Sequence, residues 1–461
     1  MRATGARLLV GDPELALAGV STDTRTLRRG DVFVALTGPN FDGNRFAPHA
    51  AAAGAAALLL SERSRPVECP AHVGLVLHPD PRRALGALGA WYRSTLAATV
   101  VGVTGSTGKT TTKNILRELL AARFPLVASP SSFNNDIGVP HTLLLADEGT
   151  RLIVVEMGTN HPGEIAALCR LAQPEIGVIT NVGAAHLAGL GSLEGVASEK
   201  GALAEALPED GLCVLNASTR QRAELAARTR ARVTTFSVEG EGSERGDLDA
   251  RRLFFHSGGT TFELNGRVVT SPLVGTHNVE NLLAAMCVAL GLGLELDELL
   301  PAVAHLRAAH GRMERIELGG VTLFDDCYNA NPQSLRAAVR VLAGLHGYRR
   351  RVLVMGDMLE LGERSADLHR ELGREAARAG VDSILLVGTH VEATASGARE
   401  AGLDRSSLVH FASAEEAALG VTELVRSGDV VLVKGSRGMA LECVVGALKQ
   451  RFGTVQMVAT A

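Results

Sequence analysis

Residues 100–112 read VVGVTGSTGKTTT, in which an apolar run passes through a glycine-rich turn into a segment that suits the start of a helix. Glycines let the backbone approach a polyphosphate closely, and a helix N-terminus presents unpaired N–H groups to anions. Lys109 adds a positive charge, and the Thr110 hydroxyl can reach a magnesium ion. The stretch therefore predicts a buried strand, a phosphate-binding loop and a helix, the repeating unit of a parallel α/β sheet.

The glycine spacing departs from the most familiar phosphate-loop pattern. Counting five residues back from Gly108 reaches Val103, and the preceding glycines stand at Gly102 and Gly105 instead. A glycine-rich turn that binds nothing is the alternative interpretation. The apolar strand before the turn and the helical pattern of residues 114–120 after it favour a site for a nucleoside triphosphate.

The composition bounds the fold class and the partners. A length of 461 residues suggests about three domains, and apolar strands that alternate with helical segments favour α/β architecture with largely parallel sheets. The formal net charge of -4 offers no overall positive field for nucleic acid or an anionic membrane. We expect no nucleic-acid partner and no membrane insertion, since no stretch has the roughly 20 apolar residues of a spanning helix.

The first residues and the cysteines indicate the cellular compartment in which the protein is expected. Residues 1–14 contain charged residues and a proline without a sustained apolar run, so no secretory leader is predicted. The six cysteines show neither a Cys-x-x-Cys pair nor a disulfide framework, which favours buried thiols in a reducing compartment: Cys69, Cys169, Cys213, Cys287, Cys327 and Cys443. We therefore expect a cytoplasmic protein, and zinc is not expected.

Pattern changes divide the chain into three predicted domains. Residues 1–96 hold short strands without a phosphate loop and end in a helical connector at 81–94. Residues 97–314 repeat strand then helix, and Asn265-Gly266 predicts a hairpin in a small antiparallel section. Residues 315–461 begin another strand-and-helix series, which predicts a Rossmann-like α/β domain.

Strand ends in the middle domain are the expected ligand-bearing positions. The predicted strands there are each followed by a loop rich in Gly, Asn or Thr: residues 99–103, 152–156, 176–181 and 212–216. Such loops carry the ligands in open α/β sheets. Two charge-dense segments, residues 220–232 and 239–252, are explained by a solvated helix face and a surface loop, and we assign them no function.

Polar side chains of the middle domain differ in how strongly the residues themselves indicate a metal site. Glu156 ends an apolar run beside the phosphate loop and can bind Mg²⁺, although carboxylates often end strands at solvent. His186 follows the next strand, and Lys200 lies in a helical segment. For His186 the residues leave the choice between a metal ligand and a surface histidine open, whereas Lys200 by itself reads as an ordinary solvated helix lysine.

Later segments gather polar side chains at predicted helix starts and strand ends. Asn278 and Asn281 lie three residues apart on one helix face, with helix capping as the alternative. Residues 325–332 read DDCYNANP, whose two acids and two amides exceed what a turn needs. Lys434 and Arg437 follow a buried strand and suit a carboxylate or phosphate, with a surface turn as the alternative.

Taken together, these segments resemble the ATP-dependent Mur ligases of peptidoglycan synthesis over the whole chain. The motifs that carry the resemblance occur in this order: STDTR (21–25), GDVFVAL (30–36), FDG (41–43), GSTGKTT (105–111), NNDIGVP (134–140), EMGTN (156–160), GTHNVEN (275–281), GRME (311–314), DDCYNANP (325–332), GDMLELG (356–362) and KGSR (434–437). Thr24 where serine is usual, and Gly438 where many relatives carry serine, are mild departures that affect fine contacts only.

The resemblance implies a three-domain ligase that joins D-alanyl-D-alanine to UDP-N-acetylmuramoyl-tripeptide. The first domain would grip the uridine nucleotide, the second would bind ATP, and the third would bring the dipeptide. The segments at 325–332 and 356–358 favour this step, because the Asp-Asn-Pro-Arg motif of the diamino-acid-adding ligase is not found. The alternatives are another amide ligase of the superfamily, such as a folylpolyglutamate-type enzyme, or a nucleotide-binding scaffold that forms no bond. A monomer is the default.

Site residues follow from the same resemblance. The implied ATP contacts are Gly105, Ser106, Thr107, Gly108, Lys109, Thr110, Thr111, Asn278, Asn281, Arg312, Asp326 and Asn329. The implied catalytic set is Lys109, Glu156, His186 and Lys200, in which Thr110 and Glu156 would hold one Mg²⁺, His186 would help hold a second, and Lys200 matches a position that is carbamylated in several relatives. Ser21, Thr22, Asp23 and Arg25 are assigned to the uridine-nucleotide substrate, and Lys434 and Arg437 to phosphate or a substrate carboxylate.

Overall fold

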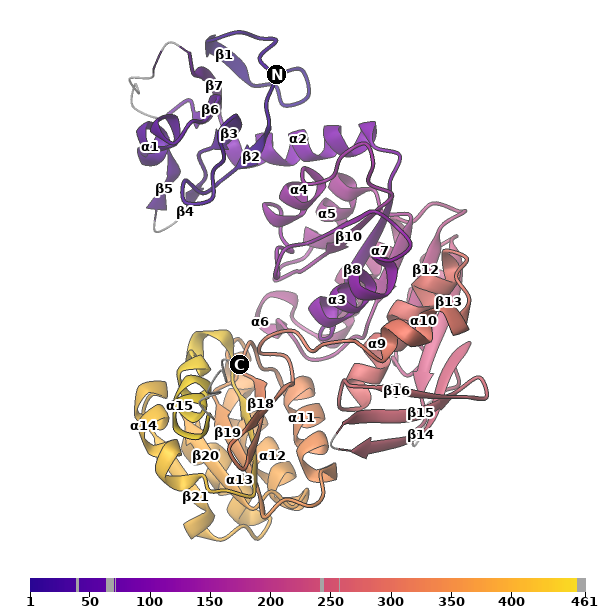
Figure 1. The fold of residues 1–461 in the computed structure, drawn as a ribbon, viewed down its shortest axis with the longest axis vertical. Coiled ribbons are helices and arrows are strands. Elements are labelled where there is room, and N and C mark those ends of the chain that lie inside the picture. The colour runs from indigo at the N-terminus through magenta and orange to yellow at the C-terminus, as the bar shows by residue number, and fades with distance from the viewer. Residues whose placement is uncertain (39–40, 64–69, 71, 241–243, 257, 454–461) are drawn as a thin grey trace, which may run out of the picture.

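The computed structural model describes residues 1–38, 41–63, 70, 72–240, 244–256 and 258–453. Within them, three larger sheets follow one another along the chain, and each forms its own lobe (Figure 1). The N-terminal lobe stands apart and is reached through helix α2, Pro81–Thr95, whereas the middle and C-terminal lobes lie next to each other. The predicted three-part α/β organisation is confirmed.

The N-terminal lobe is built on a sheet of order β1-β7-β6-β3-β2, in which β1 alone runs antiparallel to its neighbour. Its elements are β1 Arg7–Val10, β2 Gly19–Ser21, β3 Asp31–Val34, β4 Thr37–Gly38, β5 Phe41–Asp42, the 3-10 helix η1 Gly43–Phe46, α1 Ala47–Ala52, β6 Ala57–Ser61 and β7 Gly74–His78. Apolar strand residues such as Phe33 and Leu58 are buried between α1 and the sheet.

Helix α2 connects the N-terminal and middle lobes. Asp80 caps it by accepting hydrogen bonds from the Arg82 and Arg83 N–H groups, and Pro81 occupies the first turn. The helix packs on α4, Gly138–Leu143, and α5, Glu164–Ala172. The buried Arg93 guanidinium also bonds Glu175 of the middle lobe at 2.7 Å. On its other side, Ala84 and Leu85 of α2 pack against β3 and β6, so the predicted connector contacts both lobes.

The middle lobe is built on a sheet of order β16-β15-β14-β13-β12-β11-β8-β10-β9. Its strands are β8 Thr99–Thr104, β9 Leu126–Ala128, β10 Leu152–Glu156, β11 Ile176–Ile179, β12 Leu212–Asn216, β13 Arg232–Val238, β14 Leu248–His256, β15 Gly259–Leu264 and β16 Arg267–Ser271. The other helices are α3 Lys109–Leu120, α6 Leu187–Leu190, α7 Leu193–Glu205, α8 Arg222–Ala227, α9 Thr276–Gly291 and α10 Leu296–Val303. Both faces are covered, because Val101 and Val103 of β8 pack into the core beneath α3 and α9, whereas Val100 faces the core beneath α5 and α7.

The antiparallel section continues the parallel sheet directly, since β13 pairs in parallel with β14. The predicted hairpin is confirmed: Asn265 and Gly266 have φ of 48° and 75° and join β15 to β16. The surface loop predicted for residues 239–252 is wrong in its second half, where β14 has already begun at Leu248; residues 241–243 lie outside the described residues. Asp249 and Ala250 are buried there. The charged side chains of this segment belong in part to a strand, so their density alone did not indicate a loop.

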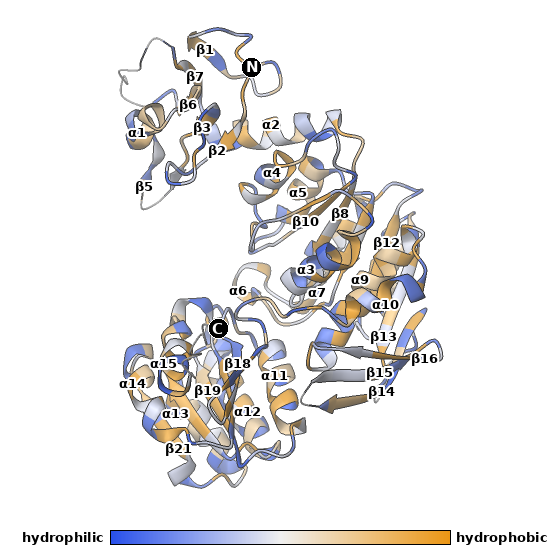
Figure 2. Cartoon of the chain, in the orientation of Figure 1, coloured by the Kyte–Doolittle hydropathy of each residue, from blue (hydrophilic) through white to orange (hydrophobic). Residues whose placement is uncertain are grey.

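The C-terminal lobe has the strand order β17-β18-β22-β19-β20-β21, parallel except for β17. Its strands are β17 Glu314–Leu318, β18 Val321–Asp326, β19 Arg350–Gly356, β20 Ser383–Val387, β21 Leu408–Phe411 and β22 Asp429–Lys434. Its helices are α11 Pro332–Gly344, η2 Gly362–Arg364, α12 Ser365–Arg378, α13 Val391–Glu400, η3 Arg405–Ser407, α14 Ala414–Leu424, η4 Arg437–Met439 and α15 Glu442–Phe452. Figure 2 shows hydrophobic residues concentrated on the inner strands of this sheet and of the middle sheet.

The structure also describes most of the cysteines and the hydropathy of the helices. Cys169, Cys213, Cys287 and Cys327 are buried free thiols, and Cys443 is half-buried. Cys69 lies outside the described residues. In the described part of the chain, no helix has the length and apolar character needed to cross a membrane.

Candidate active site between the middle and C-terminal lobes

The phosphate loop leads from β8 into α3 with backbone angles that favour glycine. Gly105 and Gly108 have φ of 150° and 83°, and Gly108 holds the N-cap position of α3. A Cβ on Gly105 would stand 1.9 Å from Thr180 Oγ1. The Lys109 ammonium donates to the Gly105 carbonyl at 2.7 Å and so folds back over the loop. The predicted strand, loop and helix are confirmed.

The segment after β11 holds the phosphate loop from one side. Asn181 Oδ1 accepts a hydrogen bond from the Thr107 N–H at 3.0 Å, and Asn181 Nδ2 donates to Thr107 Oγ1 at 2.8 Å. Ser106 Oγ donates to the Gly183 carbonyl at 3.0 Å. These contacts form because β8 and β11 are parallel neighbours whose carboxyl ends meet at one edge. Thr180 and Asn181 were not singled out from the sequence, although they are the last two residues of the strand predicted at 176–181.

Glu156 ends β10, which pairs with β8 on the opposite side from β11. Its side chain is 1% exposed, and Oε1 accepts a hydrogen bond from Asn134 Nδ2 at 2.9 Å. Oε2 has no hydrogen-bond partner among the described residues. A buried carboxylate oxygen without a partner is costly, and divalent magnesium prefers oxygen ligands of this kind. The arrangement therefore fits a cation at this strand end.

A cavity of about 1130 Å³ lies between the middle and C-terminal lobes. Its wall brings together most of the predicted site residues: Ser106, Thr107, Gly108, Lys109, Thr110, Thr111, Glu156, His186, Asn278, Asn281, Arg312, Asp326, Asn329, Lys434 and Arg437. Gly105 and Lys200 are not on this wall, and neither are the N-terminal residues Ser21, Thr22, Asp23 and Arg25.

Burial lowers the pKa of three basic side chains in this region. It lowers the pKa of Lys109, an effect that the Glu156 carboxylate partly offsets. The pKa of Lys200, which is 1% exposed in α7, falls well below its ordinary value through burial and then through the charge of Lys109. Burial, followed by the charge of Lys109, also lowers the pKa of half-buried His186. The neutral forms of Lys200 and His186 are therefore favoured.

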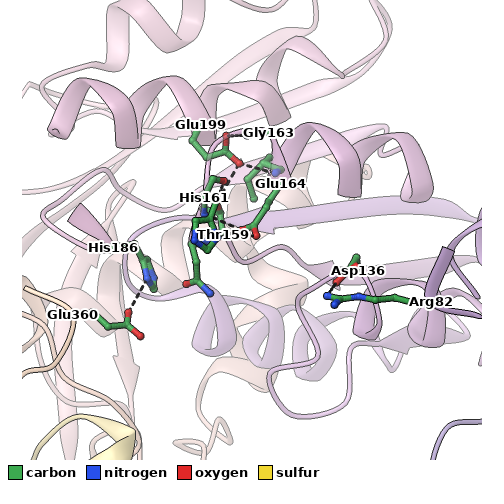
Figure 3. Close-up of polar contacts among 11 residues, drawn as sticks. Arg82, Asp136, Thr159, His161, Gly163, Glu164, His186, Glu199 and Glu360 are labelled. Atoms are coloured by element: carbon green, nitrogen blue, oxygen red, sulfur yellow. Dashed lines mark hydrogen bonds and ion pairs between the residues drawn. The ribbon is translucent and has the colours of Figure 1, made fainter. Parts of the chain in front are cut away.

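His186 is also contacted from the C-terminal lobe. Its Nδ1 lies 3.2 Å from Glu360 Oε2, on the loop after β19 (Figure 3). Glu360 has φ of 63°, in the left-handed region that non-glycine residues rarely adopt. Both residues line the cavity. Glu360 belongs to the GDMLELG motif at 356–362, but no role for this side chain was predicted from the sequence.

Asn278 and Asn281 are buried on one face of α9, as predicted. Asn278 Nδ2 donates to the Val274 carbonyl at 2.9 Å, and Asn281 Oδ1 accepts a hydrogen bond from Thr112 Oγ1 of α3 at 3.3 Å. The capping alternative is wrong, because Gly275 holds the N-cap position of α9 and no side chain caps it. Asn281 thus joins α9 to the phosphate-loop helix, whereas Asn278 holds the segment that precedes α9.

Arg312 and Tyr328 bridge the lobes. Arg312 Nη2 donates to Thr110 Oγ1 at 3.3 Å, and its guanidinium carbon lies 4.1 Å from the Tyr328 ring centroid. The Tyr328 hydroxyl donates to Ser132 Oγ of the middle lobe at 2.7 Å. Tyr328 and Ser132 were not singled out from the sequence, since nothing local relates positions that are 196 residues apart.

Asp326 and Lys434 are paired with each other across neighbouring strands. The Lys434 ammonium, 2% exposed, lies 2.6 Å from Asp326 Oδ2 and also donates to the Asn329 carbonyl at 3.0 Å. Asp326 Oδ1 accepts a hydrogen bond from the Met313 N–H. Arg437 is exposed and pairs with Glu442 at 3.2 Å. In this conformation Lys434 is therefore the counter-ion of Asp326, whereas Arg437 lies at the cavity mouth.

Carboxylates also order the loop that follows Glu156 (Figure 3). Glu199 of α7 accepts hydrogen bonds from the Gly163 and Ile165 N–H groups, at 2.6 and 2.7 Å, at the start of α5. It also accepts one from Thr159 Oγ1 at 3.1 Å. Glu199 immediately precedes Lys200, so the same helix positions both side chains.

The residues predicted for the uridine nucleotide lie at and after β2 in the N-terminal lobe. Arg25 and Asp23 form an exposed pair whose Nη2 and Oδ2 atoms lie 2.6 Å apart, and this hydrogen bond lowers the pKa of Asp23 to about 2. Arg82 of α2 does reach the cavity wall, where it pairs with Asp136 of the middle lobe (Figure 3). Arg82 was not singled out from the sequence.

Comparison with known proteins gives a consistent family assignment. Residues 16–93 match the description "Mur ligase family, catalytic domain", residues 103–289 match "Mur ligase middle domain", and residues 311–437 match "Mur ligase, glutamate ligase domain". The UDP-N-acetylmuramoyl-tripeptide–D-alanyl-D-alanine ligase of Escherichia coli (strain K12) is 40% identical over 448 residues, which cover 95% of each chain. The ligase of that name from Bacillus subtilis (strain 168) is 34% identical and covers 94% of this chain and 93% of its own.

Solved structures agree over the full length. The crystal structure of MurF from Acinetobacter baumannii superposes with a TM-score of 0.85 at 32% identity, covering 97% of both chains. The MurF ligase from Thermotoga maritima in complex with ADP superposes with a TM-score of 0.82 at 29% identity, covering 95% of this chain and 99% of the other. The chain belongs to the Mur ligase family.

Proposed function

We propose that this protein is an ATP-dependent ligase that adds D-alanyl-D-alanine to UDP-N-acetylmuramoyl-tripeptide in peptidoglycan precursor synthesis. The observation that carries the proposal is the 40% identity, over 95% of both chains, with a relative named for this reaction. The cavity supports it, because one wall carries the phosphate loop and the other comes from the C-terminal lobe. The ADP complex of the Thermotoga maritima relative supports ATP as the nucleotide.

The chemistry explains why a ligase needs such a cavity. A carboxylate is a poor acyl donor, so the γ-phosphoryl group of ATP is first transferred to the terminal carboxylate of the tripeptide. The amine of D-alanyl-D-alanine then attacks the acyl phosphate, which gives the amide and releases phosphate beside ADP. Water would hydrolyse the acyl phosphate, so the lobes must close over the reactants.

Lys109, Thr110 and Glu156 form the proposed phosphate and magnesium end of the site. Lys109 lies within the phosphate loop and places its charge where the transferred phosphoryl group would sit. Glu156 and Thr110 would hold one Mg²⁺, and the unpartnered Glu156 Oε2 fits that role. When bound, Mg²⁺ neutralises charge on the phosphate oxygens. The other loop residues between Gly105 and Thr111 would also contact the phosphates, with the N–H groups supplied by the start of α3, since the Thr107 N–H already donates to Asn181.

His186 and Lys200 form the proposed second magnesium site. The lowered pKa of His186 keeps its imidazole neutral, which a metal ligand requires. Lys200 is proposed to be carbamylated: its neutral amine attacks CO₂, a C–N bond forms and one proton is released. The low pKa of Lys200 favours the amine needed for that step. The carbamate then provides oxygens in place of an ammonium that would repel a cation.

The other site residues are proposed by their place in the lobes. Asn278, Asn281, Arg312, Asp326 and Asn329 would contact ATP, and Lys434 and Arg437 would contact phosphate or a substrate carboxylate. Ser21, Thr22, Asp23 and Arg25 would bind the uridine nucleotide. We propose residues 1–96, 97–314 and 315–461 as the corresponding substrate, ATP and dipeptide domains; β17 begins at Glu314, beside the last boundary.

The test is phosphate release from Mg-ATP with UDP-N-acetylmuramoyl-tripeptide, measured with and without D-alanyl-D-alanine, and with the product checked by mass. Dipeptide-dependent release that yields the pentapeptide is expected. Release that follows a diamino acid or glutamate instead would favour another amide ligase of the superfamily. ATP binding without dipeptide-stimulated release would favour a nucleotide-binding scaffold. A panel of tripeptides with meso-diaminopimelate or lysine decides the acceptor side chain.

A further inference from the structure

A second cluster of metal-ligating side chains lies outside the cavity, where the middle lobe joins the C-terminal lobe. His310 belongs to the segment between α10 and β17, and Glu314 and Asp325 are direct cross-strand partners in β17 and β18. His310 Nδ1 lies 2.9 Å from Glu314 Oε2 and 3.8 Å from Asp325 Oδ2. One ligand atom from each of the three lies within 4.8 Å of the others.

One carboxylate oxygen of this cluster, on Asp325, is buried without a hydrogen-bond partner among the described residues. The Asp325 side chain is 0% exposed, and Oδ1 accepts a hydrogen bond from the Cys327 N–H at 3.2 Å. Oδ2 has no hydrogen-bond partner within the described part of the chain, and it points toward His310. Two carboxylates that share this space with one imidazole carry a net negative charge whenever the imidazole is neutral. A cation at the shared point would satisfy all three groups.

We propose that His310, Glu314 and Asp325 bind a divalent transition-metal ion of the zinc class. Ligand atoms about 2.0–2.2 Å from a tetrahedral zinc lie about 3.3 Å apart, so the observed separations require only small side-chain adjustments. An imidazole nitrogen with two carboxylates suits Zn²⁺, Co²⁺ or Ni²⁺, whereas Mg²⁺ and Ca²⁺ prefer oxygen ligands throughout. The exposed side of His310 leaves the fourth position to water. The site uses no cysteine, which explains why cysteine spacing led us to expect no zinc.

An ion at this site would affect the cavity through the turn that carries Arg312. His310 and Glu314 flank the turn that carries Arg312, whose guanidinium contacts Thr110 and Tyr328. Met313 in this turn has φ of 54°, a strained value for a residue other than glycine. An ion that ties His310 to the β17–β18 hairpin would hold this turn closed. It would therefore restrict the side chain of Arg312 without lying on the cavity wall itself.

The test measures metal binding directly in the full chain. Zn²⁺ is titrated in the presence of excess Mg²⁺, the bound ions are counted by equilibrium dialysis, and Co²⁺ is used as a visible-spectrum probe. His310→Ala and Glu314→Gln are each expected to lose one Zn²⁺ per chain or to bind that ion at least about tenfold more weakly. His305→Ala is the matched control, because His305 is another exposed histidine in the segment between α10 and β17. It is expected to bind like the unmodified chain.

Thermal unfolding supplies a second readout that does not depend on ligase activity. Zn²⁺ should raise Tm for the unmodified chain and for His305→Ala, and less for His310→Ala, since only a folded-state site stabilises in this way. Equal Zn²⁺ stoichiometry and affinity in the unmodified chain and His310→Ala would overturn the proposal. The three side chains would then pair with one another without an ion.

Discussion

His186 Nδ1 and Glu360 Oε2 lie 3.2 Å apart, which joins the loop after β11 in the middle lobe to the loop after β19 in the C-terminal lobe (Figure 3). A carboxylate that accepts a hydrogen bond from Nδ1–H leaves Nε2 with a free lone pair. This is the arrangement by which outer carboxylates orient metal-binding histidines. The strained backbone of Glu360 indicates that its surroundings hold it in place for this contact.

Glu360→Gln tests this orientation. The variant should need roughly tenfold more Mg²⁺ for half-maximal ATP-dependent activity, because the imidazole is held less firmly. The free energy of unfolding should change by less than about 0.5 kcal/mol, since Glu360 is exposed and exposed ion pairs contribute little. Glu363→Gln, in the following 3-10 helix η2 and also exposed, should leave the Mg²⁺ dependence unchanged. An identical Mg²⁺ titration for all three proteins would contradict the idea.

Lys200→Ala tests the carbamate. Removing the proposed ligand should lower the ligase rate by about 10²-fold or more, and short carboxylic acids such as formate or acetate should restore part of it by supplying the missing oxygens. Lys109→Ala is the control, because its lost charge cannot be replaced by an acid. Steady-state rates at increasing acid concentration give the comparison. Absence of rescue in Lys200→Ala would count against the modification.

Gly108→Ala tests the fit between the phosphate loop and α9. A Cβ at Gly108 would stand 2.1 Å from Asn281 Oδ1, and φ is 83°, so we expect lower ATP affinity together with a stability loss of about 1–3 kcal/mol. Gly293→Ala, at φ of 89° with open space around it, should lose only about 1 kcal/mol. Nucleotide titration calorimetry and urea unfolding separate the two effects. Equal ATP affinity in both variants would show that the Asn281 side chain can move aside without weakening ATP binding.

His277 gives a prediction about pH. Burial, as the main cause, lowers its pKa from 6.5 to about 4, so the folded protein holds it neutral while the unfolded chain takes up a proton below about pH 6.5. Stability therefore falls as the pH drops from about 6.5 toward 4, with a contribution from His277 of about 2 kcal/mol at about pH 5.

His277→Phe should remove that contribution, since phenylalanine does not titrate. Urea unfolding at pH 7 and pH 5 should show a smaller loss of stability in His277→Phe than in the unmodified chain, by about 2 kcal/mol. His305→Ala, which changes an exposed histidine, should behave like the unmodified chain. A loss in His277→Phe that equals that of the unmodified chain would mean that His277 is already protonated in the folded state.

Features that depend on neighbouring residues were predictable from the sequence. The strand, loop and helix around the phosphate loop and the Asn265-Gly266 hairpin follow from periodicity and left-handed turn residues. Of the strands that were not predicted, β9, β17 and β21 lie at sheet edges, whereas β7 and β13 lie inside their sheets. An edge strand is only half buried, so its apolar run is too short or too interrupted to stand out.

By itself, the sequence determined the family, the α/β class and the phosphate loop, because each is written in short motifs and local patterns. Only the tertiary structure decided how the site residues pair. Lys434 pairs with Asp326, which is 108 residues away in the sequence, and Asn281 contacts Thr112, which is 169 residues away. It also placed His310 beside Asp325, which sequence spacing does not relate. Such contacts depend on how strands order themselves in a sheet and how lobes meet, and burial there sets which polar groups find partners.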